Sequence, residues 1–235
     1  MKIHQLTTFL ILFLGSQVCS ADLAVDESIV IYEHPSQTKH DVTVYNTDEL
    51  NNLFLEVTPF EVVKPGEQDQ ELKPLNLAST PDFLVSPNRA ILAPNSPTVV
   101  RLLNLQNTGD RERVYRINLV PANPPAELQT EEEDAVQSLL QVVVAYQILV
   151  IIMPEEPVSV VESERQGNTA VFRNSGTANY LLSDGVQCKT DEPENCVALQ
   201  SRRIYPGNTW SLDLPFDGPA SYKVRTHEGS SELVL

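Results

Sequence analysis

Few residues in this chain have the types and spacing needed for covalent or metal chemistry. The histidines are scattered and have no clustered Cys, Asp or Glu residues beside them, so we interpret them as surface side chains rather than metal ligands. They are His4, His34, His40 and His227. No G-x-S-x-G, H-E-x-x-H or G-x-x-x-x-G-K-[ST] motif occurs. The sequence therefore predicts no enzyme activity, no metal site and no cofactor.

Two cysteines have a spacing that suits a disulfide. Cys188 and Cys196 stand in CKTDEPENC with seven residues between them. In an exported protein such a pair can close across a short excursion between strands. On the chain-entropy estimate, closing so short a loop stabilises by about 2–3 kcal/mol. A metal site is the weaker alternative, because there is no second cysteine pair and the nearest later histidine is His227.

The N-terminal sequence indicates export. MKIHQLTTFLILFLGSQVCSADL has a basic start, the apolar run FLILFLG and small residues after it, which is the layout of a secretory signal peptide. We expect cleavage after Ser20 or Ala21, so residues 1–21 are excluded from the fold. The apolar run is too short to span a bilayer comfortably, which disfavours an uncleaved anchor and predicts no stable membrane insertion.

The charge of the chain excludes one class of partner. Acidic residues outnumber basic ones 32 to 16, and the net charge is −16. Binding to nucleic acid needs clustered Lys and Arg to neutralise phosphates, so we predict no nucleic-acid partner. The acidic run at 131–134 is interpreted as a solvated loop, because it lacks the regular spacing of oxygen ligands that a calcium site requires.

Proline and glycine divide the chain into short predicted strands. Turn signals recur about every ten residues. The runs between them, such as SIVIYEH, DVTVYNT and LFLEVTPFEVV, alternate or are wholly apolar. This pattern is typical of an all-β sandwich. It restarts after the linker MPEEP with VSVVESE and TAVFRNSG, so we predict two sandwiches, at residues 22–153 and 155–235.

A strand at residues 113–119 is predicted to have two different faces. Tyr115, Ile117 and Leu119 form an apolar set, and Val114, Arg116 and Asn118 form the other. Because side chains alternate along a strand, the first set is expected to fill the core while the second carries a cation and an amide outward. Pro121, Pro124 and Pro125 cannot donate to a strand ladder, so we expect pairing to end there.

The segment 139–150 has one wholly apolar face and one mixed face. The apolar face comprises Leu140, Val142, Val144, Tyr146, Ile148 and Val150. For residues 147–152 a buried central strand explains the pattern. That explanation fits residues 139–145 less well, because they follow an acidic loop and would extend the strand beyond ordinary length. A transmembrane helix is disfavoured, since the apolar run 142–153 has twelve residues and includes Gln147.

The order of these motifs resembles that of the PapD-like periplasmic chaperones of the chaperone–usher pilus pathway. The motifs that carry the resemblance are VVRLLNL, DRERVYRINLVPANPP, an apolar strand ending in proline, RNSGTANYLLSDG and RIYPGNTW. The resemblance implies an all-β fold of two Ig-like β-sandwich domains in an L-shaped arrangement. It also implies a periplasmic chaperone that stabilises pilus or fibre subunits and delivers them to an outer-membrane usher.

In the family, the segment from residue 139 corresponds to a donor strand. A pilus subunit lacks one strand, and the chaperone adds its own strand by main-chain hydrogen bonds while alternate side chains fill the exposed groove. The resemblance assigns the donor positions to Leu140, Val142, Val144 and Tyr146. Each buried aliphatic side chain is expected to contribute about 1.5–3 kcal/mol.

Two groups of family positions are changed in this sequence. Members of the family anchor the C-terminal carboxylate of the subunit with two cations, but the aligned residues here are Ile29 and Leu149. Arg116 is our candidate anchor, because a guanidinium binds a carboxylate with two parallel hydrogen bonds. A surface arginine paired with a nearby acid is the alternative for Arg116. Arg89 and Arg101 are weaker candidates.

The second change concerns the ion cluster between the two domains of the family. Arg101 and Glu112 occupy two of its positions, whereas the third, which is normally basic, is Met153. We therefore expect an Arg101–Glu112 ion pair and a less polar domain junction. These changes indicate a divergent branch of the family.

Two other classes of protein remain as alternatives. The first is an Ig-like structural subunit or adhesin of a surface fibre, which should lack one strand and carry a spare donor segment at its N-terminus. Here the mature chain starts almost directly on SIVIYEH, and the spare apolar strand lies in the middle. An exported hydrolase on a sandwich scaffold is disfavoured by the missing catalytic residues. Which subunit is bound, and whether the free chain caps itself by dimerising, are left open.

Overall fold

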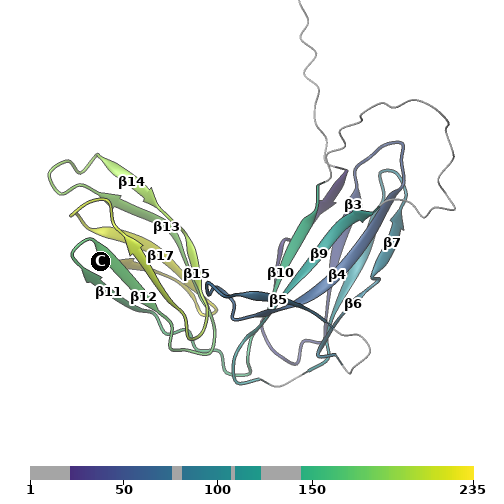
Figure 1. Ribbon diagram of the computed structural model, residues 1–235, viewed down its shortest axis with the longest axis horizontal. Helices are drawn as coiled ribbons and strands as arrows, with labels where there is room; N and C mark the ends of the chain where they lie inside the picture. The colour runs from purple at the N-terminus through teal and green to yellow at the C-terminus, as the bar shows by residue number, and fades with distance from the viewer. Residues whose placement is uncertain (1–21, 76–80, 107–108, 123–143) are drawn as a thin grey trace, which may run out of the picture.

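The computed structural model describes residues 22–75, 81–106, 109–122 and 144–235, and all regular structure in these ranges is β. Figure 1 shows two β-sandwiches set at an angle to each other, which gives the molecule an L shape. The predicted class, all-β with two Ig-like domains, is confirmed. The predicted signal peptide at 1–21 lies outside the described residues. No helix in the described ranges has the length and apolarity needed to cross a membrane.

The first sandwich contains ten strands in two sheets. They are β1 (Leu23–Val25), β2 (Ile29–Tyr32), β3 (Lys39–Asn46), β4 (Leu53–Val63), β5 (Glu71–Pro74), β6 (Phe83–Ser86), β7 (Arg89–Leu92), β8 (Pro97–Asn104), β9 (Arg113–Ala122) and β10 (Tyr146–Ile152). One sheet has the order β1-β3-β8-β6, and the other has the order β2-β10-β9-β4-β5 with β7 also paired to β4. The N-terminal part of the chain therefore contributes one strand to each sheet.

Alternation along β9 and β10 builds the first core. Tyr115, Ile117 and Leu119 are buried, as predicted, and Ile148 and Val150 join them from β10. The order β2-β10-β9 also confirms that residues 147–152 form a central strand. β9 continues through the first proline of its cluster and ends at Ala122, slightly later than predicted. Beyond Leu119 it pairs with β4 but not with β10, and proline is tolerated where one side of a strand is unpaired.

The second sandwich contains eight strands. They are β11 (Glu162–Gln166), β12 (Thr169–Arg173), β13 (Tyr180–Cys188), β14 (Cys196–Leu199), β15 (Arg202–Ile204), β16 (Thr209–Asp213), β17 (Ala220–Thr226) and β18 (Gly229–Val234). Sheet β11-β12-β16 faces sheet β14-β13-β17-β18 across a core that includes Phe172, Tyr180 and Tyr222. The predicted disulfide Cys188–Cys196 is present and joins β13 to β14. The predicted division of the chain at residue 154 falls between β10, the last strand of the first sandwich, and β11, the first strand of the second. The domain bounds themselves stay a prediction.

An apolar cluster fills the junction between the sandwiches. It comprises Val62, Val114, Leu149, Ile151 and Met153 from the first sandwich with Ala178 and Tyr205 from the second. Met153, at the position that is basic in the family, is only 4% exposed. Leu149, at a position where the family carries a carboxylate anchor, is also buried there. The junction is thus less polar than the family pattern would give.

The expected Arg101–Glu112 ion pair is wrong. Arg101 lies on β8, in the other sheet, and donates hydrogen bonds to both carboxylate oxygens of Asp41 at 2.7 and 2.8 Å. Arg101 lies opposite Asp41 because β8 pairs with β3. Its side chain faces solvent on the outer surface of that sheet. Glu112 does cross the junction, but with other partners.

Glu112 joins the sandwiches through Asn179. Its backbone N–H donates to the carbonyl oxygen of Thr177 at 3.0 Å, and its Oε2 accepts from the backbone N–H of Asn179 at 2.9 Å and from the Asn179 side-chain amide. Arg203 in turn donates to Asn179 Oδ1. The Oε1 of Glu112 is buried without a hydrogen-bond partner among the described residues. Burial raises the pKa of Glu112 to about 7, although the Asn179 hydrogen bonds and the charge of Arg203 oppose that shift.

This raised pKa predicts a pH-dependent stability. A carboxyl whose pKa is higher in the folded state stabilises the fold while it is protonated, and that contribution is lost as the pH rises from about 4.5 through about 7. We expect Glu112→Gln, which mimics the protonated side chain, to flatten the decline in the free energy of unfolding over this range. Urea denaturation at about pH 5 and about pH 8 measures it.

The matched control is Glu194→Gln, which changes an exposed glutamate far from the junction. Its pH dependence should equal that of the unsubstituted protein. A Glu112→Gln protein whose stability changes with pH as steeply as the control would show that Glu112 does not titrate in this range.

Candidate functional site

One face of the sheet β2-β10-β9-β4-β5 carries the residues of interest in a single row. Ile29 on β2 pairs with Leu149 on β10, Leu149 pairs with Arg116 on β9, and Arg116 pairs with Phe60 on β4. Directly paired residues point to the same face of a sheet. Arg116 therefore lies next to the two positions at which the family carries cations, one strand over from Leu149.

Cations from both sandwiches act on one buried side chain at the junction, Tyr205. Burial raises the pKa of Tyr205, and the positive charges of Arg203, Arg116 and Arg202 oppose that shift. Arg116 of the first sandwich thus lies close enough to Tyr205 to act on it, together with two arginines of the second. Arg202 donates to the carbonyl oxygen of Gly66 at 2.9 Å, and Arg203 donates to Asn179 Oδ1. None of the three arginines forms an ion pair with a carboxylate among the described residues.

Sequence reasoning missed the contribution of Arg202 and Arg203. Arg203 begins the motif RIYPGNTW and Arg202 directly precedes it, and in the sequence that motif served only as part of the family resemblance. Nothing in the local sequence indicates that this turn faces the first sandwich. The one available signal was the pair of adjacent arginines. Adjacent strand residues point to opposite faces, so one of the two side chains must face away from the core of the second sandwich.

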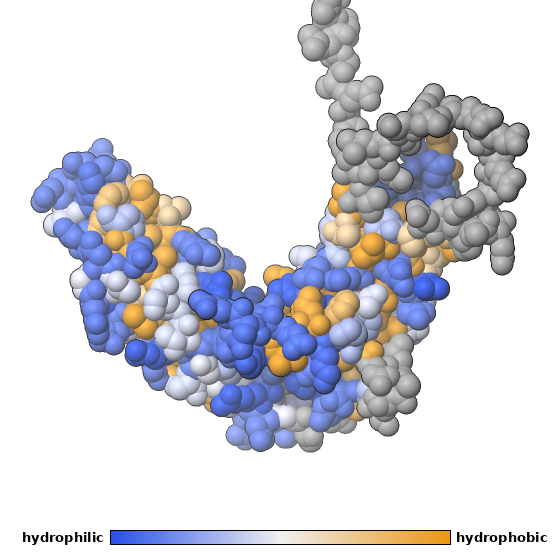
Figure 2. Space-filling model, viewed as in Figure 1, coloured by the Kyte–Doolittle hydropathy of each residue, from blue (hydrophilic) through white to orange (hydrophobic). Residues whose placement is uncertain are grey.

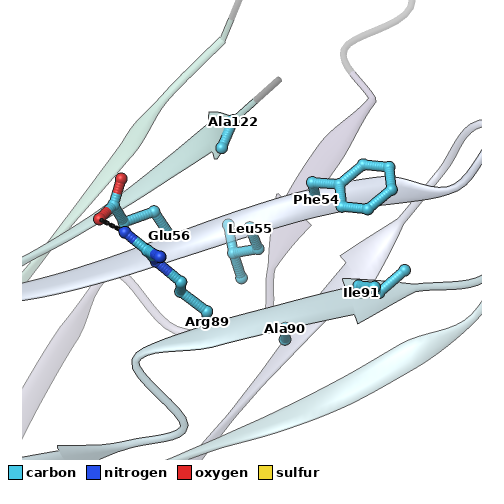
Figure 3. A pocket seen from close by; sticks show the side chains of 7 residues that line it. All are labelled: Phe54, Leu55, Glu56, Arg89, Ala90, Ile91 and Ala122. Atoms are coloured by element: carbon cyan, nitrogen blue, oxygen red, sulfur yellow. Dashed lines mark hydrogen bonds and ion pairs between the residues drawn. The ribbon is translucent and has the colours of Figure 1, made fainter. Parts of the chain in front are cut away.

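The other candidate arginines lie elsewhere. Arg89 is 79% exposed at its side chain and binds Glu56 at 3.3 Å. Figure 3 shows this pair at one end of an open cleft of about 500 Å³. The cleft is lined by Phe54, Leu55, Glu56, Arg89, Ala90, Ile91 and Ala122. Glu56 pairs with Val120, which is four residues beyond Arg116 on β9. Of the three candidates, only Arg116 lies in the row next to Leu149.

The β-sheet edge beside the start of β10 is open. β2 runs parallel to β10 from Leu149 onward, where the Leu149 N–H donates to the carbonyl oxygen of Ser28 at 2.9 Å. Residues 146–148 pair with β9 on one side, and no described strand pairs with them on the other. An unpaired edge presents main-chain donors and acceptors to any extended segment that reaches it.

The predicted donor residues lead up to this open edge. Val144 is 37% exposed, and Tyr146 is partly buried against the first core. Leu140 and Val142 lie outside the described residues. Figure 2 shows apolar surface on the first sandwich near the upper end of β10. Gln147, on the opposite face, donates to Asn118 Oδ1 at 2.7 Å and so extends the Arg116 face with polar groups.

The histidines of the described ranges do not gather at this site. His40 contacts Glu27 at 3.0 Å, and His227 lies 3.8 Å from its neighbour Glu228. No group of three or more His, Cys, Asp or Glu residues in the described part of the chain is arranged to hold a metal.

Solved structures with the same fold cover nearly the whole chain. The structure of the Salmonella enterica SafA pilin in complex with the SafB chaperone matches with a TM-score of 0.63 and 18% identity, over 92% of this chain and 97% of that one. The E. coli chaperone DraB matches with a TM-score of 0.58 and 20% identity, over 91% and 97%. The CsuC–CsuE chaperone–tip adhesion subunit complex of Acinetobacter baumannii matches with a TM-score of 0.58 and 13% identity, over 91% and 98%. A comparison with curated protein sequences gives no match.

At these low identities the structural matches establish the fold, whereas a family model identifies the lineage. The model for pili and flagellar-assembly chaperones, PapD N-terminal domain, matches residues 22–157, which is more than half of the chain. This protein belongs to the family of pili and flagellar-assembly chaperones.

Proposed function

We propose that the protein is a periplasmic chaperone that binds pilus or fibre subunits by donor-strand complementation and delivers them to an outer-membrane usher. The observation that carries the proposal is the open sheet edge at residues 146–148, directly after the apolar donor positions. Two matching structures contain a chaperone with a pilin or a tip adhesion subunit, which supports the same mode of action.

The open edge suits strand addition because it offers two kinds of contact at once. The main chain beside residues 146–148 can continue the sheet into a second protein. Leu140, Val142 and Val144 can then place alternate apolar side chains into the groove of an incomplete subunit, each contributing about 1.5–3 kcal/mol. Tyr146 already packs partly against the first core, so we assign it to the boundary between the two molecules. This mechanism requires no nucleotide.

The carboxylate anchor is assigned to Arg116, with Arg203 and Arg202 beside it. A subunit strand added next to β10 would end near the row that contains Leu149 and Arg116. A free carboxylate there meets guanidinium groups that have no acidic partner among the described residues. Charge-assisted hydrogen bonds from a guanidinium are about twice as strong as neutral ones.

Export to the periplasm follows from the proposed signal peptide and agrees with the disulfide. Cys188–Cys196 requires an oxidising compartment to form and persist. The alternative, a structural subunit, would have an incomplete sandwich of its own. Both sandwiches here have closed cores, with Ile117, Ile148, Phe172 and Tyr180 fully buried. A self-capping dimer of the free chain remains a prediction.

The donor strand is tested by charged substitutions. Val142→Asp or Val144→Asp places a carboxylate where an apolar groove must accept a side chain, so we expect the soluble 1:1 complex with a co-expressed subunit to weaken about a hundredfold or more. Copurification and size-exclusion chromatography measure the complex. Val99→Asp, at a valine of the opposite sheet that is 47% exposed against 37% for Val144, should leave it intact. Unchanged binding by both donor-strand variants would contradict the proposal.

The anchor is tested by Arg116→Ala. Loss of a charge-assisted bidentate contact is expected to weaken subunit binding about tenfold or more, and Arg116→Lys should recover part of it. Arg89→Ala is the matched control, because Arg89 already binds Glu56 away from the row. Titration with a subunit whose C-terminal carboxylate is amidated should reproduce the Arg116→Ala loss. A normal yield of complex from Arg116→Ala would remove Arg116 from the anchor.

A further inference from the structure

A hairpin of the first sandwich reaches the second. β4 and β5 pair from Phe60 with Pro74 to Val63 with Glu71, and the loop between them extends beyond the sheet. Figure 1 shows this hairpin crossing from the first sandwich to a position beside β15 of the second. It is separate from the Glu112–Asn179 contact, which starts from the residue before β9.

The hairpin tip binds the second sandwich through two main-chain carbonyl groups. The carbonyl oxygen of Pro65 accepts from Asn208 Nδ2 at 2.7 Å, and that of Gly66 accepts from Arg202 at 2.9 Å. Backbone acceptors fix position better than flexible side chains do, because they have no rotamers to lose. The contact therefore holds one defined point of the first sandwich against the second.

Both partners of this contact, the hairpin tip and the Tyr205–Asn208 turn, are stabilised by hydrogen bonds within their own sandwich. In the hairpin, the Gly66 N–H donates to Gln70 Oε1 at 2.8 Å, and Lys64 forms an ion pair with Asp69. In the second sandwich, the Asn208 N–H donates to the carbonyl oxygen of Tyr205 at 3.0 Å. The neighbouring Gly207 N–H donates to the carbonyl oxygen of Asn174, and Asn174 is itself buried. A displacement of the tip along the second sandwich would thus break the two hydrogen bonds to Asn208 and Arg202, because neither the hairpin nor the turn is free to follow the other.

Gly66 fits this contact because it has no side chain. Its φ of +78° is unfavourable for other residues, and a Cβ added there would lie 2.7 Å from Asn208 Nδ2 and 2.8 Å from Tyr205 Cδ2. Both distances are far below van der Waals contact. The backbone of the hairpin therefore packs directly on the Tyr205–Asn208 turn, and any larger residue would push the two apart.

We propose that residues 64–66, Arg202, Tyr205 and Asn208 form an interdomain clamp that sets the angle between the sandwiches, and that Gly66 is a positioning residue for subunit binding. Tyr205, which packs on the hairpin tip, also belongs to the apolar cluster that contains Leu149, and Leu149 pairs directly with Arg116. Holding the angle therefore holds Tyr205, and the arginines Arg202 and Arg203 that precede it in the chain, at a fixed place relative to the row that contains Arg116. The part concerning subunit binding rests on the proposed function, whereas the part concerning the angle does not.

The clamp is tested with two glycine variants of the mature chain. Gly66→Ala adds a methyl group into the contact. Gly167→Ala is the matched control, since Gly167 also has a positive φ, of +59°, but has no atom within 4 Å of the added Cβ. Spin labels at Leu50→Cys and Val234→Cys, exposed sites on different sandwiches, report the distance distribution between the domains. We expect Gly66→Ala, and independently Asn208→Ala, to broaden or shift this distribution, and Gly167→Ala to leave it unchanged.

Subunit binding is then measured on the same variants. Because a preorganised site binds more tightly, we expect Gly66→Ala to weaken the complex about five- to tenfold while Gly167→Ala does not. A distance distribution for Gly66→Ala that matches that of Gly167→Ala overturns the clamp. A shifted distribution with unchanged affinity overturns the positioning role of Gly66. The distance measurement needs no subunit, so failure of the unsubstituted chain to bind any subunit would refute the proposed function and leave the clamp to its own test.

Discussion

β2 pairs with β10 only from Leu149 to Ile152. The proposed subunit-binding surface depends on residues 146–148 of β10, which precede that pairing. From Leu149 onward β10 is an interior strand whose side chains fill the first core on one face and the domain junction on the other. Before it, the same strand has β9 on one side and an open edge on the other. Because the chain before β2 joins the opposite sheet as β1, no strand in the described ranges pairs with this edge.

The charge distribution of the site contrasts with that of the whole chain. The protein carries a net charge of −16, yet Arg116, Arg202 and Arg203 gather at the junction without a carboxylate partner in the described ranges. An acid close to them, Glu112, is buried and has a raised pKa, so its negative charge is reduced near neutral pH. Such a site favours a ligand that brings a carboxylate of its own, which a free C-terminus does.

Sequence reasoning was sound where the cause is local. Alternation placed Tyr115, Ile117 and Leu119 in the core, and it put Arg116 on the opposite face, because side-chain direction along a strand follows from backbone geometry alone. The Arg101–Glu112 pair failed for a different reason. Whether two charged residues meet depends on which sheet each strand enters, and β8 pairs with β3 in the sheet that does not contain β9.

The contacts between the two sandwiches could not be predicted from the sequence either, because they too depend on how distant strands are placed in space. Gly66 is separated from Arg202 and Asn208 by more than a hundred residues, and only the relative placement of two folded sandwiches brings them together. The dipeptide Pro65-Gly66 predicts a turn from its local chemistry, but no pattern in the sequence indicates which residues of the second sandwich that turn contacts. Asn179 lies in the motif RNSGTANYLLSDG, and nothing in that motif indicates that its hydrogen-bond partner, Glu112, lies in the other sandwich.

Rigidity at the junction has a consequence for a chaperone that works without nucleotide. Glu112 precedes β9 and the hairpin tip follows β4, so two neighbouring strands each hold the second sandwich at a different point. A single contact would allow rotation about itself, whereas two contacts and the apolar cluster remove that freedom. In the proposed clamp, the entropy of fixing Arg202 and Arg203 relative to Arg116 is lost when the chain folds rather than when a subunit binds. Binding energy from the donor strand can therefore go almost wholly into holding the subunit.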